Sequence, residues 1–202
     1  TLILYLLSRL NSSRTRAFSV TFPGISNNKD QLIDLAKKFN SELRFINFSE
    51  NDFWDLIPIS AKYMDDPITD YAVVPTFKLA QEASKTLKVV LTGEGGDEIF
   101  SGYGRYRASK RNFFFKKKPF GKGAFDSFKE MSKKLEGWNY DLDAARFSLE
   151  NANLTDLQKS QYLDCQEWLP NNLLIKLDRC LMANSIEGRT PLVDINIFSY
   201  FF

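Results

Sequence analysis

The sequence predicts an α/β fold with an appended helical lobe, because two kinds of apolar pattern alternate in its first half. Short β-branched and aromatic runs, typical of strands, alternate with segments in which apolar residues recur at helical spacing. Such alternation is typical of βαβ units, whose strands form a parallel sheet flanked by helices. After residue 106 only helical patterns are recognisable, so we expect an α/β half over residues 1–108 and a helical half over 109–202.

The predicted elements of the first half follow from these patterns in chain order. Strands are expected at 16–22, 43–48 and 89–91, and helices at 1–10, 30–39, 49–64 and 73–87. Pro23 and Gly24 end the first strand, and Ser49 with Asp52 in the third following position forms an approximate capping box. The first helix and the strand at 89–91 are strongly apolar, so both are expected to be buried.

The second half shows helical patterns at 125–135, 141–150, 154–168 and 171–184. The halves meet without a composition typical of a linker, so one compact unit is expected. The chain opens on an apolar helix without an initiator Met, and it ends on the apolar run 195–202. Because such a run makes a poor free terminus, we expect the sequence to be part of a longer polypeptide.

Composition excludes several classes of protein. A net charge of +2 over 202 residues gives no global attraction to nucleic acid or membranes, and the apolar run at the start is too short to span a bilayer. Histidine is absent, which excludes a histidine-based triad and histidine metal ligands within this sequence. The two cysteines, Cys165 and Cys180, indicate no disulfide framework, as expected in a reducing, cytoplasmic compartment.

A glycine-rich, acidic turn follows the strand at 89–91 and is the main functional signal. Its glycines and acids are Gly93, Glu94, Gly95, Gly96, Asp97 and Glu98. A strand, a glycine turn and a helix N-terminus together present backbone N–H groups to a phosphate. Carboxylates beside a phosphate imply a divalent cation between them, so the spacing predicts a Mg²⁺–nucleotide site. The alternative is an ordinary turn, in which glycine and acidic residues are common.

Three segments resemble the asparagine synthetase family, in its C-terminal synthetase domain. The turn lies in LTGEGGDEIFSGY (91–103), which is similar to the family's signature. KLDR and EGRTPLVD, within residues 176–194, resemble its second motif. AFSVTFPG (17–24) resembles the strand beside the adenine. The three segments occur in the family's order and cover nearly the whole chain.

The resemblance implies an adenine nucleotide α-hydrolase-like (ATP pyrophosphatase) sheet, built around a phosphate loop of the form Ser-Gly-Gly-x-Asp-Ser. That loop is absent here, and residue 1 resembles the position directly after it. The strand before the loop is central in such sheets, so we expect residues 1–202 alone to fold poorly or to expose a sticky groove. Because the loop itself is absent, we also expect them to be inactive. The resemblance also implies a glutaminase domain and a later catalytic lysine, both outside this sequence, and it leaves a homodimer open.

The function that the resemblance implies is ATP-dependent amidation of aspartate to asparagine, with Mg²⁺ as the cofactor. Aspartate and ATP form an aspartyl-adenylate and pyrophosphate, and ammonia from glutamine then displaces AMP. The motifs do not define the acceptor pocket. A related amidotransferase or a β-lactam-synthetase-like enzyme acting on another carboxylate therefore stays open, as does a non-catalytic fragment. No nucleic acid or membrane partner is expected.

Two acids of the turn carry the implied chemistry. Asp97 is the candidate Mg²⁺ ligand, and the alternative is that it caps the following helix. Glu94 is the candidate general base toward ammonia, and the alternative is a solvated turn residue.

Nucleotide contacts are assigned to the turn and to the first strand. The resemblance places four turn residues against the nucleotide: Thr92, Gly93, Gly95 and Gly96. Of these, Thr92 and Gly93 are expected to make their contacts through backbone groups. The resemblance also places Val20 against the adenine, although a valine in a strand is equally expected to be buried in the core.

Four further residues are candidate substrate contacts. Tyr103 and Arg105 offer a hydroxyl and a guanidinium that can orient a carboxylate or phosphate, the alternatives being helix packing and a surface charge. Glu187 and Arg189 either contact substrate or form a buried ion pair that holds the helical lobe against the sheet, and we favour the ion pair.

Basic residues gather between residues 105 and 122, with phenylalanines among them. They are Arg105, Arg107, Lys110, Arg111, Lys116, Lys117, Lys118 and Lys122. This pattern is compatible with nucleic-acid binding. We favour a solvated surface of the helical lobe that also attracts an anionic nucleotide.

Overall fold

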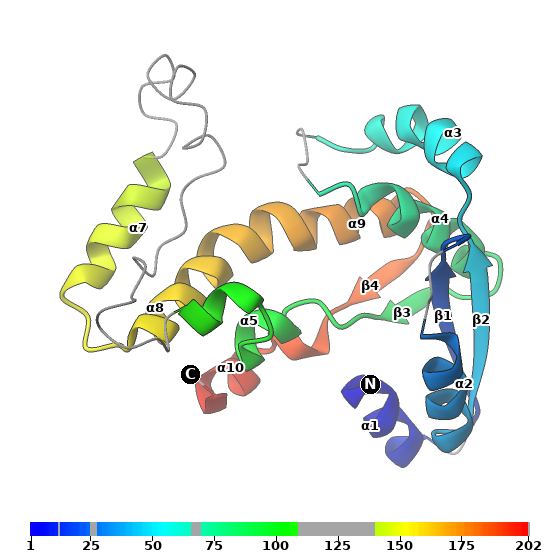
Figure 1. Cartoon of the computed structure of the whole chain (residues 1–202), viewed down its shortest axis with the longest axis horizontal. Coiled ribbons are helices and arrows are strands. Elements are labelled where there is room, and N and C mark those ends of the chain that lie inside the picture. Colours follow the sequence, from blue (N-terminus) through cyan, green and yellow to red (C-terminus); the bar gives the residue numbers. More distant parts are fainter. Residues whose placement is uncertain (12, 25–27, 66–69, 109–139, 202) are drawn as a thin grey trace. The chain divides into compact units, whose positions relative to one another are not determined.

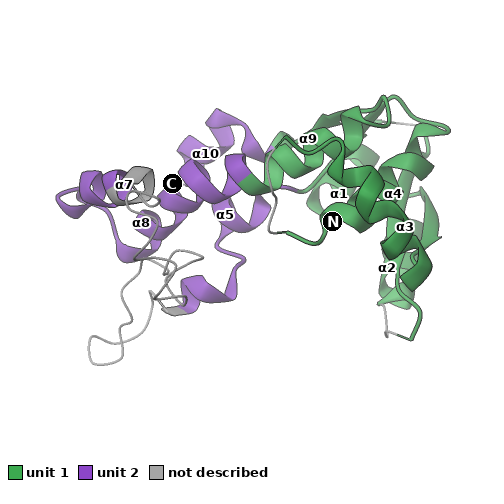
Figure 2. Cartoon of the chain, turned by 90° about the horizontal axis from the view of Figure 1, so that it is seen from above, with its two compact units in different colours: residues 1–93, 172–191 green, residues 94–171, 192–202 purple. Residues whose placement is uncertain are grey.

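The computed structural model describes all residues of the chain except 12, 25–27, 66–69, 109–139 and 202. It forms two compact units: unit 1 comprises residues 1–93 and 172–191, and unit 2 comprises residues 94–171 and 192–202 (Figure 2). The expected junction at residue 108 does not coincide with this division, and the domain boundaries stay a prediction. The helix expected at 125–135 and the basic residues from Lys110 to Lys122 lie outside the described residues.

The first sheet of unit 1 consists of β1 (Thr15–Thr21) and β2 (Ser41–Asn47), which pair in parallel (Figure 1). Thr15 lies opposite Ser41, and α2 (Lys29–Lys38) forms the crossover between the strands. Parallel neighbours need such a crossover, because a tight turn cannot return the chain to the same end. The predicted strand, helix and strand are confirmed here, with boundaries that differ by a residue or two.

The second sheet of unit 1 pairs β3 (Val89–Leu91) in parallel with β4 (Glu187–Arg189). Parallel pairing is confirmed, but the described residues form two separate two-stranded sheets and not the single sheet that was expected. The prediction that the strand at 89–91 is buried is wrong, since Val89 is 48% and Leu91 42% exposed. The strand β4 was not predicted, because its sequence, Glu-Gly-Arg, lacks the apolar residues typical of strands.

Helix α4 (Val73–Ser84) connects the two hydrophobic clusters of unit 1. Its first half packs against side chains of α3 (Glu50–Ala61) and against Phe48, which follows β2. The cluster contains Phe48, Leu56, Val73, Val74, Phe77 and Cys180. Its second half packs on α9 (Ile175–Met182), in a cluster that contains Ala80, Ala83, Leu177, Leu181 and Ile186. The helix thus holds segments from both ends of the sequence in one core.

Helix α1 (Leu2–Leu10) forms as predicted, but it is not buried. None of its residues is buried, and Leu10 is 84% exposed. The periodic apolar pattern predicts the helix because it depends only on the residues of the helix itself. Burial depends on what packs against the helix, which the local pattern does not specify.

Unit 2 is helical in its described part. Its main elements are α5 (Gly96–Phe100), η1 (Gly104–Ala108), α7 (Tyr140–Glu150), α8 (Asp156–Leu163) and α10 (Ile195–Phe201). A π-helical segment, η3 (Asp164–Leu174), follows α8 directly and contains Pro170, so the expected break between two helices near that residue does not occur. Among the described residues, no helix combines the length and apolar character needed to cross a membrane.

Candidate functional site

The predicted site residues fall in both units, because the chain passes from unit 1 to unit 2 inside the glycine turn. Thr92 and Gly93, which follow β3, lie in unit 1. Val20 of β1 and the residues Glu187 and Arg189 of β4 lie in the same unit. Glu94 is the first residue of unit 2. The residues of each unit are therefore described in turn.

Thr92 and Gly93 extend the carboxyl end of β3. The Thr92 N–H donates to the Arg189 carbonyl at 2.9 Å, so this donor is already used within the protein. The Thr92 Oγ1 atom is buried and has no hydrogen-bond partner among the described residues. Gly93 is exposed, and an added Cβ would meet no described atom within 4 Å. Packing therefore gives no reason for a glycine at this position, whereas close approach of a ligand to the backbone would give one.

Val20 lies in β1 opposite Ile46 and is partly buried. Its side chain packs against the cluster that contains Phe77 and Cys180. The packing reason for a valine is therefore present, and the contact with adenine stays a prediction.

Glu187 and Arg189 form an ion pair on β4, with 2.7 Å between Glu187 Oε1 and an Arg189 guanidinium nitrogen. The prediction that this pair is buried is wrong, because the two side chains are 55% and 63% exposed. Both stand on one face of the strand, since alternate residues of a strand point to the same side. An exposed pair of this kind stabilises a protein by about 0–1 kcal/mol, so it does not hold structural elements together.

Gly95 and Gly96 begin the short helix α5 and are closely packed. Gly95 has a left-handed backbone (φ +85°), and an added Cβ there would lie 2.5 Å from Val193 Cγ2. A Cβ on Gly96 would lie 3.1 Å from Leu192 Cδ1. Packing alone explains these two glycines, and their contact with a nucleotide stays a prediction.

Asp97 lies in the first turn of α5 and is exposed. The alternative role as a helix cap is wrong, because the N-cap residue is Gly95 and no side chain caps this helix. The Asp97 carboxylate lies directly over Gly102, where an added Cβ would come within 1.9 Å of Oδ1. The Gly102 N–H also donates to the Asp97 carbonyl at 2.8 Å. Gly102 thus makes room for this carboxylate and fixes the backbone that carries it.

Asp97 suits a hard cation such as Mg²⁺, which prefers carboxylate oxygens and usually keeps several waters. Glu94, the candidate general base, lies three residues before Asp97 and is partly buried. No group of three or more cysteine and acidic side chains that could hold a metal occurs in the part of the chain that the structure describes. Asp97 would therefore be one protein ligand to an ion held mainly by phosphate oxygens and water.

Glu98, the third acid of the turn, has a different environment and was not assigned a role from the sequence. It is buried, being 1% exposed, and its Oε1 accepts a hydrogen bond from the Tyr103 hydroxyl at 2.6 Å. Burial and this acceptor raise the pKa of Tyr103 above its ordinary value. Successive helical residues point about 100° apart, which explains why Asp97 is exposed and Glu98 is buried.

Arg105 has partners within unit 2. Its guanidinium forms an ion pair with Asp164 at 2.9 Å and lies over the Tyr103 ring, 3.9 Å from the ring centroid. Although burial alone lowers the pKa of Arg105, the hydrogen bond and charge of Asp164 raise it above its ordinary value. Asp164 also accepts from the buried Tyr106 hydroxyl. Tyr103 and Arg105 are thus engaged in internal contacts, and a direct contact with substrate stays a prediction.

The KLDR segment on α9 pairs with acids that follow α3. Lys176 Nζ lies 2.8 Å from Asp70 Oδ2, and the Lys176 side chain is only 6% exposed. Burial alone raises the pKa of Asp70, but hydrogen bonds from Lys176 and the Ala72 N–H, with the lysine charge, hold it below 3.8. Arg179 pairs with Asp65 at 2.5 Å. Asp70 was not assigned a role from the sequence, because its partner is more than a hundred positions away.

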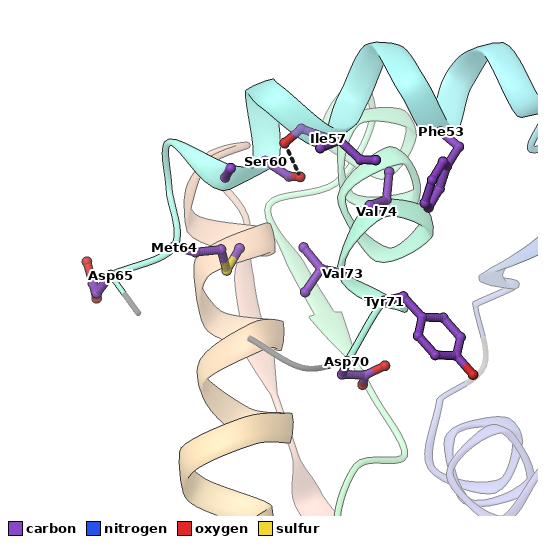
Figure 3. A pocket seen from close by; sticks show the side chains of 10 residues that line it. Phe53, Ile57, Ser60, Met64, Asp65, Asp70, Tyr71, Val73 and Val74 are labelled. Atoms are coloured by element: carbon purple, nitrogen blue, oxygen red, sulfur yellow. Dashed lines mark hydrogen bonds between the residues drawn. The ribbon is translucent and has the colours of Figure 1, made fainter. Parts of the chain in front are cut away.

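A cavity of about 480 Å³ lies between α3 and α4 in unit 1 (Figure 3). Its lining is mostly apolar, with Asp65 and Asp70 among the polar residues. Figure 3 shows α3 side chains such as Phe53 facing Val74 of α4. None of the residues assigned from the sequence lines this cavity.

Comparison with known proteins places these features in one family. A family model described as asparagine synthase matches residues 1–202. Asparagine synthetase (glutamine-hydrolysing) 1 of Bacillus subtilis (strain 168) is 28% identical in an alignment 209 residues long, and the match covers 82% of this chain and 33% of that protein. A Mycobacterium tuberculosis (strain ATCC 25618 / H37Rv) protein with the provisional name asparagine synthetase (glutamine-hydrolysing) is 30% identical in an alignment 190 residues long, and the match covers 75% of this chain and 29% of that protein.

The matched region thus spans about a third of the length of these relatives. The match to the family model, by contrast, includes every residue of this chain, the glycine–acid turn and the KLDR segment among them. The chain therefore belongs to the asparagine synthase family.

Proposed function

We propose that this protein converts aspartate to asparagine with ATP, through an aspartyl-adenylate. The observation that carries the proposal is the turn after β3, where an exposed Asp97 lies over Gly102 and a partly buried Glu94 lies three residues earlier. The turn stands at the carboxyl end of a parallel strand, where α/β sheets place their ligands. Membership of the asparagine synthase family supports the same activity.

Two bond-forming steps make up the proposed reaction. A side-chain carboxylate oxygen of aspartate attacks the α-phosphorus of ATP, and the bond to pyrophosphate breaks. Ammonia then attacks the activated carbonyl carbon, and AMP leaves with the electron pair of the broken C–O bond. Glu94 removes a proton from the nitrogen, and such general-base catalysis contributes about 10²- to 10⁴-fold in rate.

Asp97, which is exposed and whose carboxylate lies over Gly102, would hold the cation that accompanies ATP. When bound, Mg²⁺ neutralises charge on the departing pyrophosphate. Thr92 and Gly93 line the approach of the phosphates, and the buried Thr92 Oγ1 is a hydroxyl that a ligand could satisfy. In this proposal the two parallel sheets belong to an ATP pyrophosphatase-type fold.

The nitrogen source is proposed to be glutamine, hydrolysed by a glutaminase domain outside residues 1–202. The support is that the named relatives are described as glutamine-hydrolysing and that this chain corresponds to about a third of their length. Supplying ammonium chloride in place of glutamine separates this part of the proposal from the synthetase reaction.

The test compares two variants in the protein as its gene encodes it, with asparagine formation and aspartate-dependent ATP–pyrophosphate exchange as the measurements. Glu94→Gln is expected to keep the exchange reaction and to lose asparagine formation by about 10²- to 10⁴-fold, because only the second step needs the base. Asp97→Asn is expected to weaken both. Glu82→Gln, an exposed glutamate paired with Lys85 in unit 1, is the control and leaves both unchanged.

Three outcomes contradict parts of the proposal. Absence of aspartate-dependent exchange in the natural protein would overturn the activity. Exchange that another carboxylate supports better than aspartate would replace the acceptor. Equal loss of both reactions in Glu94→Gln would remove the assignment of Glu94 as the base for the second step.

A further inference from the structure

The helix that carries Asp97 is very short, and a side chain of α8 bonds the backbone near its C-terminal end. Gln161 of α8 donates from Nε2 to the carbonyl oxygens of Glu98 at 2.7 Å and Ile99 at 2.9 Å. Gln161 is itself buried, being 6% exposed. The amide nitrogen of Gln161 thus donates to two successive backbone carbonyls of α5.

Such a partner is needed because α5 cannot satisfy its own backbone. A helix of five residues leaves its last four carbonyls without intrahelical partners, and a helix this short is unstable alone. The Asp97 carbonyl accepts from the N–H groups of the cap residue Ser101 and of Gly102, and the Gln161 amide donates to the next two carbonyls. The C-cap residue, Ser101, has a left-handed backbone (φ +59°), so the chain turns sharply directly after them.

Neighbouring positions on the same helical segment support the turn from the same side. Asp164, three residues after Gln161, pairs with Arg105, and Trp168 lies 5.8 Å from the same guanidinium. Because Gln161 bonds α5 while Asp164 and Trp168 both contact Arg105 of η1, the segment bearing Gln161 packs along the stretch from α5 to η1. Gln161 is the member of this segment that bonds the Asp97 helix directly.

We propose that Gln161 is a positioning residue for the cation site: by holding the α5 carbonyls it sets the direction of the Asp97 carboxylate. This inference rests on the proposed function, in which Asp97 binds the cation that accompanies pyrophosphate. Gln161 touches neither cation nor substrate and acts only through α5. Groups that orient a metal ligand from behind typically change metal affinity or activity 10–100-fold when they are removed.

The test replaces Gln161 with methionine, which has similar length and no donor. The probe is Mg²⁺ with inorganic pyrophosphate, and its binding to the protein as its gene encodes it is followed by calorimetry. Gln161→Met is expected to raise the Mg²⁺ concentration needed for half-saturation about 10-fold. Gln166→Met is the matched control, since Gln166 lies on the same helical segment, is exposed and donates from its amide nitrogen to the Tyr162 hydroxyl at 3.0 Å.

A purely structural role is separated from positioning by a second readout, the amide hydrogen exchange of residues 96–102. Positioning predicts faster exchange in this segment together with the shifted Mg²⁺ dependence. Faster exchange with an unchanged Mg²⁺ dependence would overturn the inference, and so would no change in either. If Gln161→Met does not fold, the shorter amide in Gln161→Asn gives the same comparison in a milder form.

Failure of the proposed function is recognisable separately. If the unaltered protein binds no Mg²⁺-pyrophosphate and shows no aspartate-dependent exchange, the assignment of Asp97 fails and the inference falls with it. If the unaltered protein binds Mg²⁺-pyrophosphate and shows aspartate-dependent exchange, and Gln161→Met gives the same values, only the inference about Gln161 is overturned.

Discussion

Two glycines of the same turn, Gly93 and Gly95, differ in what requires them. Gly93 has open space where a side chain would stand, whereas a Cβ on Gly95 would come within 2.5 Å of Val193. Gly95 also has a φ of +85°, which L-residues with a Cβ rarely adopt. Replacing each glycine by alanine therefore separates a requirement for ligand binding at Gly93 from a requirement for folding at Gly95.

We predict that Gly93→Ala changes the free energy of unfolding by less than about 0.5 kcal/mol, as at other open surface positions. The same change is predicted to weaken ATP binding about tenfold, because the new methyl group stands where the phosphates approach. Gly95→Ala is predicted to destabilise the protein by about 2–4 kcal/mol through overpacking and the left-handed backbone. Urea unfolding and ATP titration measure the two effects. Equal ATP affinity in Gly93→Ala and the unaltered protein would contradict a ligand at this position.

The three acidic residues of the turn differ in burial, which the composition of the turn does not predict. Glu94, Asp97 and Glu98 are equivalent as acids in the sequence, yet Asp97 is exposed and Glu98 is buried beneath Tyr103. The short helix that begins at Gly96 separates them by rotation, and its boundaries come from the packing of Gly95 on Val193. The sequence therefore identified the turn but not which of its acids faces solvent.

At the scale of one element, the start of α3 shows a predicted cap that is confirmed. Ser49 and Asp52 form a complete capping box, in which each side chain accepts from the other residue's backbone N–H. Lys78 of α4 also donates to Asp52 and, with Ser49, lowers the pKa of Asp52 to about 2. The cap thus connects α3 to α4 through a charge that the local pattern did not reveal.

This depressed pKa gives the cap a defined pH dependence. Because the folded pKa of about 2 is below the ordinary value of 3.8, the stabilisation by Asp52 is complete above pH 3.8 and is lost as the pH falls toward 2. We predict that Asp52→Asn lowers the free energy of unfolding by about 1–2 kcal/mol at neutral pH. The difference should shrink below pH 4 in urea unfolding series, whereas the exposed Asp55→Asn control should differ little at any pH. A constant difference down to pH 2 would contradict the assignment.

Elements formed by distant residues were not predictable from local patterns. Glu187–Arg189 is a strand because it pairs with β3 and because Gly188 lies against α9, where an added Cβ would be 2.4 Å from Leu181. Nothing in Glu-Gly-Arg itself favours an extended conformation. The helix at 2–10 is the opposite case. Its apolar periodicity correctly predicted that the helix forms, but it did not predict that the helix is left unburied.

At the scale of the whole molecule, we predict that residues 1–202 produced alone release no pyrophosphate in an aspartate-dependent manner. The Ser-Gly-Gly-x-Asp-Ser phosphate loop that the family resemblance implies does not occur in residues 1–202, so the backbone donors that such a loop offers to pyrophosphate are not supplied by this sequence. The protein as its gene encodes it is the positive control, and its Asp97→Asn variant sets the background of the pyrophosphate assay. Robust aspartate-dependent turnover by residues 1–202 alone would contradict this prediction.

The family, the parallel α/β character and the position of the glycine–acid turn follow from the amino-acid sequence alone. These features depend on short motifs and on periodicities within single elements, which can be recognised from local sequence. The folded structure was needed to show that Gln161 bonds α5, that Lys176 pairs with Asp70 and that Glu187 and Arg189 are exposed. Each of these depends on which surfaces meet when the chain folds, and burial and pairing between distant residues leave no local signal in the sequence.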